Sequence, residues 1–237
     1  MKRTVPSIHT PMAEPQDHRL LFRKAFPFWD TLTEEDQEAV LRSAHAVRFE
    51  GGTNIHDGNE CTGIILIRTG SLRLYLLSED GKEITLYRLF AGDLCIFSAS
   101  CALDAVTFDI FVDAEEDSDC VVIGGCVFED LCRRLPNVKI FALETALGRF
   151  SDIMWVMEQI LFMSMDKRLA IFLLDETAKN GTDTVKLTHE QIAKYVGSAR
   201  EVVSRMLKYF STEGMVSVSR SDGIRILNKQ KLRDLTR

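Results

Sequence analysis

Residues 187–210 read LTHEQIAKYVGSAREVVSRMLKYF and contain two amphipathic helical segments separated by a glycine. Thr188 is a favourable N-cap, and Gln191 three residues later completes the pattern of a capping box. Gly197 stands where a chain turns sharply without a side-chain clash, and Ser198 after it is expected to cap the second helix. Apolar residues recur at helical spacing in that second helix, namely Val202, Val203, Met206, Leu207 and Phe210. The stretch therefore predicts a helix-turn-helix, a motif whose second helix enters the major groove of DNA.

A β-hairpin is predicted directly after this motif. Residues 215–220 and 224–227 are strand-like, and the Asp-Gly pair at 222–223 between them is typical of a tight hairpin turn. A winged helix carries its wing at this place. An ordinary pair of surface helices with an arginine-rich face is the alternative, and the hairpin makes it less favourable.

Charge is distributed unevenly along the chain. Residues 181–237 contain 11 Lys or Arg and 6 Asp or Glu, a net charge of +5, whereas the whole chain carries −6. Residues 1–180 therefore carry −11. A basic module attached to an acidic body is typical of a nucleic-acid-binding protein with a separate regulatory part.

The segment GSAREVVSR at 197–205 resembles the recognition helix of the Crp/Fnr family of bacterial transcription regulators. The resemblance extends from about Leu21 to the end of the chain. It implies an α+β fold with an antiparallel β-roll or jelly roll of the cyclic-nucleotide-binding type, a long dimerisation helix and a C-terminal winged helix-turn-helix. The expected boundaries are a flexible tail at 1–20, the sensor domain at 21–135, the dimerisation helix at 136–163 and the DNA-binding domain at 164–237.

Composition is consistent with a globular, non-membrane protein. The chain has 237 residues, is 46% hydrophobic and 27% charged, and contains no apolar run near the roughly 20 residues that span a bilayer. No secretory signal is visible, so we expect a cytoplasmic protein without a membrane partner. We find no acid–base pair, phosphate-binding glycine loop or metal cluster, and therefore expect no enzyme and no catalytic or metal-binding residue.

The sensor region shows many short strands separated by turns. Residues 34–46 read as a helix capped by Thr33 with Val40 and Leu41 inward, and residues 78–82 as a hairpin turn. The expected strands are 46–50, 63–68, 71–77, 83–89, 105–113 and 119–123. This spacing favours a sandwich or roll.

The pocket that the resemblance implies departs from the cyclic-nucleotide pattern. Family members that bind cyclic nucleotides hold the ribose with a glutamate and the phosphate with an arginine, and these positions fall at about Phe97 and Phe108. No Arg or Lys occurs between Arg88 and Arg133. A buried phosphodiester without a charged partner is strongly disfavoured, so cyclic AMP is not the expected effector.

No cofactor is assigned, but the pocket composition suits an apolar or aromatic small molecule, or haem. A filled, ligand-free core is the alternative. We considered His56 as a haem or metal ligand and favour a structural role, because no second His or Cys lies at a ligand spacing. The expected pocket residues are Cys95, Phe97, Ser98, Cys101, Phe108, Ile153 and Met154.

Six cysteines occur in the chain, five of them between residues 95 and 132. Reduced, mostly buried thiols are the default in a cytosolic protein of this size. The oxygen-sensing branch of the family holds an iron–sulfur cluster through N-terminal cysteines. Because this chain has no cysteine before Cys61, we do not expect that cluster. A thiol switch, for example between Cys95 and Cys101, remains open.

A long helix with a heptad pattern follows Pro136. Its apolar residues alternate at spacings of four and three, which favours a coiled-coil seam, although a buried intramolecular helix shows the same pattern. Because a dimer reads two DNA half-sites, we predict a parallel homodimer, with a hinge near 163–166 and the first helix of the DNA-binding module at 166–178. The expected dimer residues are Leu143, Leu147, Phe150, Met154, Met157 and Leu161.

The resemblance also implies which residues touch DNA. Arg200, Glu201 and Arg205 match the base-reading residues of the family, and Ser204 matches a serine of the Fnr branch. These residues suit palindromes with TGTGA-like or TTGAT-like half-sites. Residues expected at phosphates are Thr188, Ser198 and Lys208, whereas Ala199 and Val202 replace hydroxyls that family members often have.

We therefore expect a homodimeric regulator that binds double-stranded DNA. RNA polymerase is a further candidate partner, although nothing in the sequence marks a surface for it. A small-molecule or redox signal in the β-roll is expected to control it. A haem- or thiol-based sensor of the same family is one alternative, and an effector-independent DNA-architectural protein is another.

Overall fold

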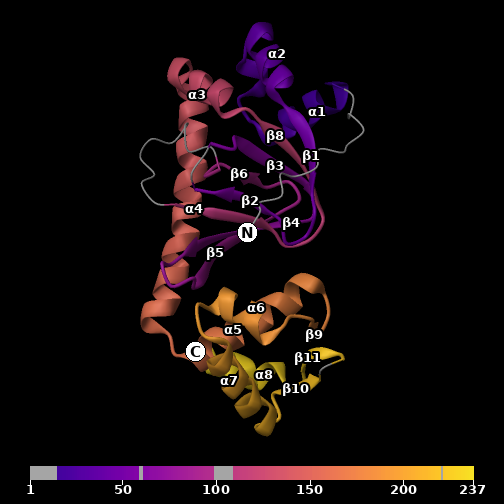
Figure 1. Cartoon of the computed structure of the whole chain (residues 1–237), viewed down its shortest axis with the longest axis vertical. Helices are drawn as coiled ribbons and strands as arrows, with labels where there is room; N and C mark the ends of the chain where they lie inside the picture. Colours follow the sequence, from indigo (N-terminus) through magenta and orange to yellow (C-terminus); the bar gives the residue numbers. More distant parts are fainter. Residues whose placement is uncertain (1–14, 59–60, 99–108, 220) are drawn as a thin grey trace. The chain divides into compact units, whose positions relative to one another are not determined.

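The computed structural model describes residues 15–58, 61–98, 109–219 and 221–237 (Figure 1). It contains two compact units. The first comprises residues up to 76 together with 86–152, and the second comprises 77–85 together with 153–237. One boundary falls within the longest of the described helices, and the other two fall within the strands that flank the turn at residues 78–82.

Two four-stranded antiparallel sheets form the body of the first unit, with strand orders β1-β8-β3-β6 and β2-β7-β4-β5 (Figure 1). The first sheet contains β1 (His45–Phe49), β3 (Ile64–Thr69), β6 (Leu94–Cys95) and β8 (Ser118–Ile123). The second contains β2 (Asn54–Asp57), β4 (Ser71–Leu77), β5 (Glu83–Phe90) and β7 (Phe111–Ala114). This arrangement confirms the predicted roll.

Apolar side chains fill the interior of this roll. Strand β3 is buried from Ile64 to Ile67, and Leu72 and Leu74 of β4 are fully buried. The turn at residues 78–82 is confirmed, since the Ser78 amide donates to the Lys82 carbonyl. A strand was predicted at 105–113, of which residues 105–108 lie outside the described residues. The strand observed in this region is β7, which begins at Phe111 and ends at Ala114.

Helices accompany the sheets in the first unit, namely α1 (Pro15–Ala25), the 3-10 turn η1 (Trp29–Thr31), α2 (Glu34–Ser43) and α3 (Gly125–Arg134). Thr33 caps α2 as predicted, and its hydroxyl accepts from the Asp36 amide at 3.2 Å. Two expectations differ from the structure. The predicted tail at 1–20 overlaps α1, because Pro15 begins a helix, and the helix predicted at 34–46 ends at Ser43, because β1 begins at His45.

The predicted long helix is α4 (Pro136–Phe162), and α5 (Met165–Asn180) follows it. The interruption falls at residues 163–164, where Ser164 adopts an extended conformation with ψ 159°. This break lies at the start of the hinge expected from the sequence.

The second unit holds the helix-turn-helix, formed by α6 (His189–Val196) and α7 (Arg200–Thr212), and a three-stranded wing of β9 (Thr184–Val185), β10 (Val216–Ser219) and β11 (Gly223–Ile226). Helix α8 (Lys229–Leu235) follows. The capping box at the start of α6 and the left-handed glycine at 197, with φ 60°, are both confirmed. The cap expected at Ser198 is wrong: Ala199 is the N-cap of α7 and makes no side-chain cap bond. One apolar core joins α5, α6, α7, the three-stranded wing and α8.

Candidate DNA interface and sensor site

Helix α7 is held in place by its buried face. Val203, Leu207 and Phe210 are all at most 1% exposed and belong to the core of the second unit. The preceding turn is also fixed, because Arg168 of α5 donates from Nη1 to the Val196 carbonyl at 2.8 Å, at the end of α6. A rigid core therefore positions whatever the outer face of α7 presents.

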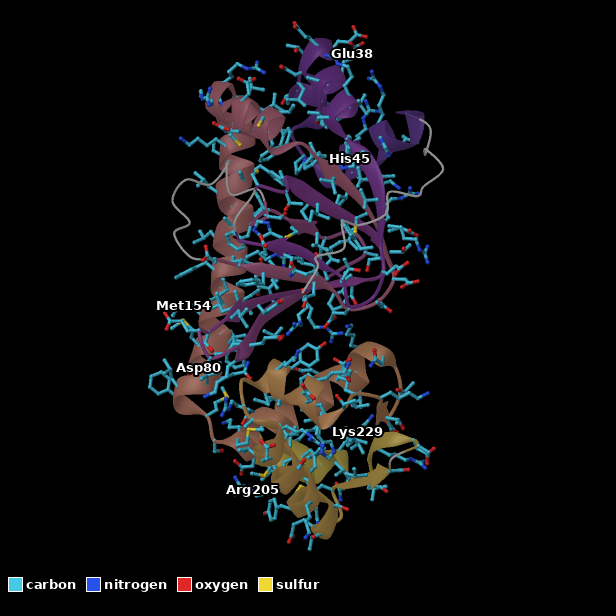
Figure 2. The ribbon with its side chains drawn as sticks, viewed as in Figure 1. Glu38, His45, Asp80, Met154, Arg205 and Lys229 are labelled. Atoms are coloured by element: carbon cyan, nitrogen blue, oxygen red, sulfur yellow. The ribbon has the colours of Figure 1, made fainter. Side chains whose placement is uncertain are left out.

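Three of the predicted base-reading residues lie on that outer face. Arg200, Glu201 and Arg205 are exposed, and within the described part of the chain none of their side chains forms an ion pair or hydrogen bond. Figure 2 shows Arg205 at the surface of this unit. A guanidinium group without a partner can donate hydrogen bonds to base edges in the major groove, and a carboxylate can accept them.

Ser204 differs from these three residues. Its hydroxyl lies 2.8 Å from Nδ1 of His189, the first residue of α6, and both side chains are half-buried. This contact is not apparent in the sequence, because residues 15 positions apart in two different helices share no local pattern.

The predicted phosphate contacts lie close to the turn and along α7. Thr188 is exposed, and its Oγ1 accepts from the Gln191 amide at 3.1 Å, which leaves the hydroxyl proton free to donate. Ser198 is half-buried, and Lys208 is exposed.

In the first unit, the predicted pocket residues Cys95, Phe97 and Ser98 are buried. The Ser98 hydroxyl lies 2.7 Å from the Gly63 carbonyl and 3.1 Å from the Cys95 carbonyl, so it is satisfied by the backbone. Burial raises the pKa of the Cys95 thiol above its usual range. The other two predicted β-roll residues, Cys101 and Phe108, lie outside the described residues.

An arginine on the long helix lies close to Tyr87 and Asp93, a contact that was not among the predictions from the sequence. Arg149 of α4 donates to Asp93 at 3.3 Å and to Asp152 at 3.4 Å, and its guanidinium carbon lies 5.3 Å from the centre of the Tyr87 ring. Burial holds the pKa of the Tyr87 phenol well above its ordinary value. Arg149 lies one helical turn before Ile153, one of the predicted pocket residues, so the two side chains share a face of α4. This i, i+4 spacing is the sequence signal that could have placed Arg149 near the pocket.

Met154 does not fit the pocket to which we assigned it. Ile153 is 9% exposed, whereas Met154 is 45% exposed, because consecutive helical residues point in different directions. Figure 2 shows Met154 at the outer edge of α4. Its exposure agrees with the second assignment, a place in the apolar seam.

That seam forms an exposed apolar stripe along α4. The six predicted residues are between 45% and 66% exposed in the single chain, namely Leu143, Leu147, Phe150, Met154, Met157 and Leu161. Ile140, Trp155 and Phe162 are also exposed on the same helix. Large exposed apolar patches are rare on monomeric proteins and are typical of interaction sites.

The cysteines and His56 have definite environments. Cys61 is disulfide-bonded, whereas Cys95, Cys120, Cys126 and Cys132 are free thiols. The suggested pairing of Cys95 with a second cysteine is therefore wrong for this state. The buried His56 ring lies 2.9 Å from the Thr62 hydroxyl through Nδ1, and burial lowers the pKa of its imidazole.

Two family models match the chain. The Crp-like helix-turn-helix domain matches residues 167–235, and the cyclic nucleotide-binding domain matches residues 47–135. A crystal structure described as a transcriptional regulator of the Crp/Fnr family from Eubacterium rectale is 42% identical, with a TM-score of 0.85 over 90% of this chain and 98% of that chain. This chain belongs to the Crp/Fnr family.

Curated regulators of this kind are more distant in sequence. The transcriptional regulator Flp of Lacticaseibacillus casei is 24% identical over 210 residues, which cover 88% of this chain and 94% of Flp. The fumarate and nitrate reduction regulatory protein of Escherichia coli K12 is 29% identical over 180 residues, which cover 71% and 69% of the two chains.

Membership of the Crp/Fnr family makes this chain a transcription regulator with a DNA-binding helix-turn-helix, and neither matching model is that of an enzyme. None of the described helices is both long and apolar enough to cross a bilayer. Within the same described residues, no group of three or more His, Cys, Asp or Glu side chains is arranged to hold a metal ion.

Proposed function

We propose that this Crp/Fnr regulator binds palindromic promoter sites as a homodimer, under the control of a signal other than a cyclic nucleotide. The proposal rests mainly on the outer face of α7. There the side chains of Arg200, Glu201 and Arg205 are exposed and have no hydrogen-bond or ion-pair partner within the described residues. Arginine suits bidentate donation to guanine, and glutamate suits acceptance from a cytosine amine. Thr188, Ser198 and Lys208 are proposed to contact phosphates.

Selection from a random DNA pool tests this function directly. The purified chain should enrich a palindrome whose half-sites resemble TGTGA or TTGAT, with centres about one helical turn apart. If the selection enriches no consensus, and DNA affinity varies with salt concentration but not with DNA sequence, sequence-specific regulation is refuted. An architectural protein would then be favoured.

The apolar stripe on α4 supports the homodimer. An identical stripe on a second copy would cover the exposed side chains by knobs-into-holes packing in a parallel coiled coil. Family members act as dimers, and a two-fold dimer presents two reading helices to two half-sites. Sedimentation of the chain with and without DNA tests this assembly.

Charge around Arg149 argues against a cyclic nucleotide as the signal. Its guanidinium is already shared between Asp93 and Asp152, so the three groups together carry a net negative charge. A phosphodiester placed there would meet more negative than positive charge, which is unfavourable in a partly buried site. Titration with cyclic AMP should show no saturable binding at micromolar concentration.

We propose that an apolar or aromatic small molecule, or haem, binds beside Tyr87 and Phe97, whose ring centres lie 6.5 Å apart. An absorption spectrum of the purified chain separates haem from a colourless ligand. Mass spectrometry of whatever is released on denaturation then identifies the class of ligand.

A thiol signal is a second candidate, and the disulfide at Cys61 favours it. Reduction of that disulfide by a dithiol such as dithiothreitol yields two thiols and the oxidised reductant. DNA affinity that changes reversibly between reduced and oxidised protein would support the thiol signal. Equal affinity in the two states would exclude it.

A further inference from the structure

The Ser204 hydroxyl can make only a limited number of hydrogen bonds. It has one proton to donate and two lone pairs to accept with, and the contact with His189 Nδ1 at 2.8 Å uses one of these. If the imidazole accepts, Ser204 retains only acceptor capacity. If the imidazole donates, the hydroxyl proton is free for another acceptor.

Ser204 occupies a position where this restriction matters. It lies four residues after Arg200 and three after Glu201, so all three side chains belong to the same side of α7. The other two side chains are exposed and make no hydrogen bond within the described chain. Among the predicted base-reading residues, only Ser204 is hydrogen-bonded to a neighbouring helix in the described structure.

We infer that His189 is a specificity-determining residue, which orients the Ser204 hydroxyl and fixes it as either a donor or an acceptor toward one base of the half-site. This inference rests on the proposed base-reading role of α7. A free serine hydroxyl rotates to suit either kind of base edge, and therefore discriminates poorly. A hydroxyl held by His189 discriminates between bases that present an acceptor, such as thymine O4, and bases that present a donor, such as adenine N6.

The test uses the full chain and duplexes based on the sequence selected by the wild type. Each half-site position is changed in turn to the other three bases, symmetrically in both halves, and affinity is measured by fluorescence anisotropy. The variants are Ser204→Ala, His189→Ala, the double variant and His189→Asn. Asparagine places an amide group near the position of the imidazole Nδ1, and it should preserve the contact.

We expect the Ser204 and His189 variants to lose discrimination between bases at the same half-site position. Ser204→Ala and His189→Ala should each reduce discrimination at the same base position by roughly threefold to tenfold, the range for one hydrogen bond. The double variant should lose no more than Ser204→Ala alone, because both changes remove the same interaction. His189→Asn should retain most of the discrimination, and thermal unfolding checks that every variant is folded.

Two results would overturn the inference while leaving sequence-specific regulation intact. If His189→Ala weakens all duplexes equally, and does so in the Ser204→Ala background as well, then His189 contacts the DNA backbone. If Ser204→Ala leaves the base profile unchanged, then Ser204 reads no base. A wild-type protein that selects no consensus at all would instead contradict the proposed function itself.

Discussion

Arg205 and Lys208 lie one turn apart on α7 and both are exposed, but we expect their loss to affect DNA binding differently. Arg205→Ala should cost roughly 1–3 kcal/mol of discrimination at one base position, because it removes a base contact. Lys208→Ala should weaken binding to all sequences similarly and reduce the salt slope by about 1, because one phosphate is no longer neutralised. Anisotropy titrations over a series of salt concentrations distinguish the two, and an unchanged base profile for Arg205→Ala would refute its reading role.

Thr188 caps α6 and is proposed to contact a DNA phosphate, and one substitution should separate these two roles. Asp is as good an N-cap as Thr, and its charge interacts favourably with the start of α6, so Thr188→Asp should unfold at nearly the wild-type temperature. The same carboxylate would repel a phosphate and should lower DNA affinity at least about tenfold. Thr188→Ala is the matched control, expected to lose about 1 kcal/mol of stability. Wild-type affinity in the Asp variant would show that Thr188 lies away from the backbone.

The chemistry of single residues was only partly predictable. Arg200, Glu201 and Arg205 follow from the resemblance of one short segment, and their exposure agrees with the expected role. The partner of Ser204 and the Asp93 carboxylate beside Arg149 did not follow, whereas Asp152 lies only three residues after Arg149 on the same helix. His189 meets Ser204 only because α6 and α7 cross, and Asp93 meets Arg149 across 56 residues of chain. Local sequence patterns carry no information on such contacts.

At the level of elements, the wing depends on a glycine. Gly223 has φ 84°, and a Cβ at this position would overlap the carbonyl oxygen of Val185 in the neighbouring strand β9. Gly181 has a similar φ of 63° but open space around it. Gly181→Ala should therefore cost only the backbone term of about 1–2 kcal/mol, and Gly223→Ala clearly more. Thermal unfolding compares the two, and equal shifts would contradict the proposed close approach.

Helices α2 and α3 are joined by an ion pair whose effect should depend on pH. The hydrogen bond from Arg134 to Asp36, at 2.7 Å, holds the pKa of this carboxyl below its usual range. A depressed folded pKa stabilises the protein above the unfolded value of about 3.9, and this contribution disappears as pH falls through the folded pKa.

Asp36→Asn should therefore cost about 1–3 kcal/mol at pH 7, where it leaves the arginine without its buried partner. The difference from wild type should shrink below about pH 4. Asp130 also pairs with Arg134 but is 50% exposed, so Asp130→Asn should have a much smaller effect. Thermal unfolding of the three proteins at pH 7 and pH 3 provides the measurement, and a pH-independent difference would contradict the linkage.

Elements with strong local patterns were predicted well, and those that depend on tertiary context were not. Strand β4 at 71–77 and the capping box at Thr188 have the predicted positions. Pro15 was interpreted as part of a tail, although proline is also favoured in the first turn of a helix, where α1 places it. Ser198 is a good capping residue by type, but the turn places Ala199 at the cap.

On the scale of the whole molecule, the proposed base reading and the proposed dimerisation use surfaces of different character. The outer face of α7 presents the polar side chains of Arg200, Glu201 and Arg205. Helix α4 instead carries an apolar stripe that is exposed in the single chain. The heptad pattern alone could not decide between a buried helix and a dimer seam. Exposures of 45–66% now favour the dimer, because a buried helix would have its seam covered by the same chain.

Leu147→Glu should therefore separate assembly from folding. Leu147 is 65% exposed, so a carboxylate costs the single chain little, but a two-fold seam would bury two such charges against apolar neighbours. The variant should sediment as a monomer at micromolar concentration with an unchanged helix content. Its affinity for a full palindrome should fall by about a hundredfold or more, because the second half-site is no longer bound by a linked module.

Ser151→Glu is the matched control for this experiment. Ser151 is exposed on the same helix, one turn beyond Leu147 and outside the four-three seam, so the same charge should leave the dimer largely intact. Affinity for a single half-site should be similar in the two variants, since neither touches the reading helix. A Leu147→Glu protein that remains a dimer with wild-type palindrome affinity would show that α4 is not the interface, and the apolar stripe would then require a different partner.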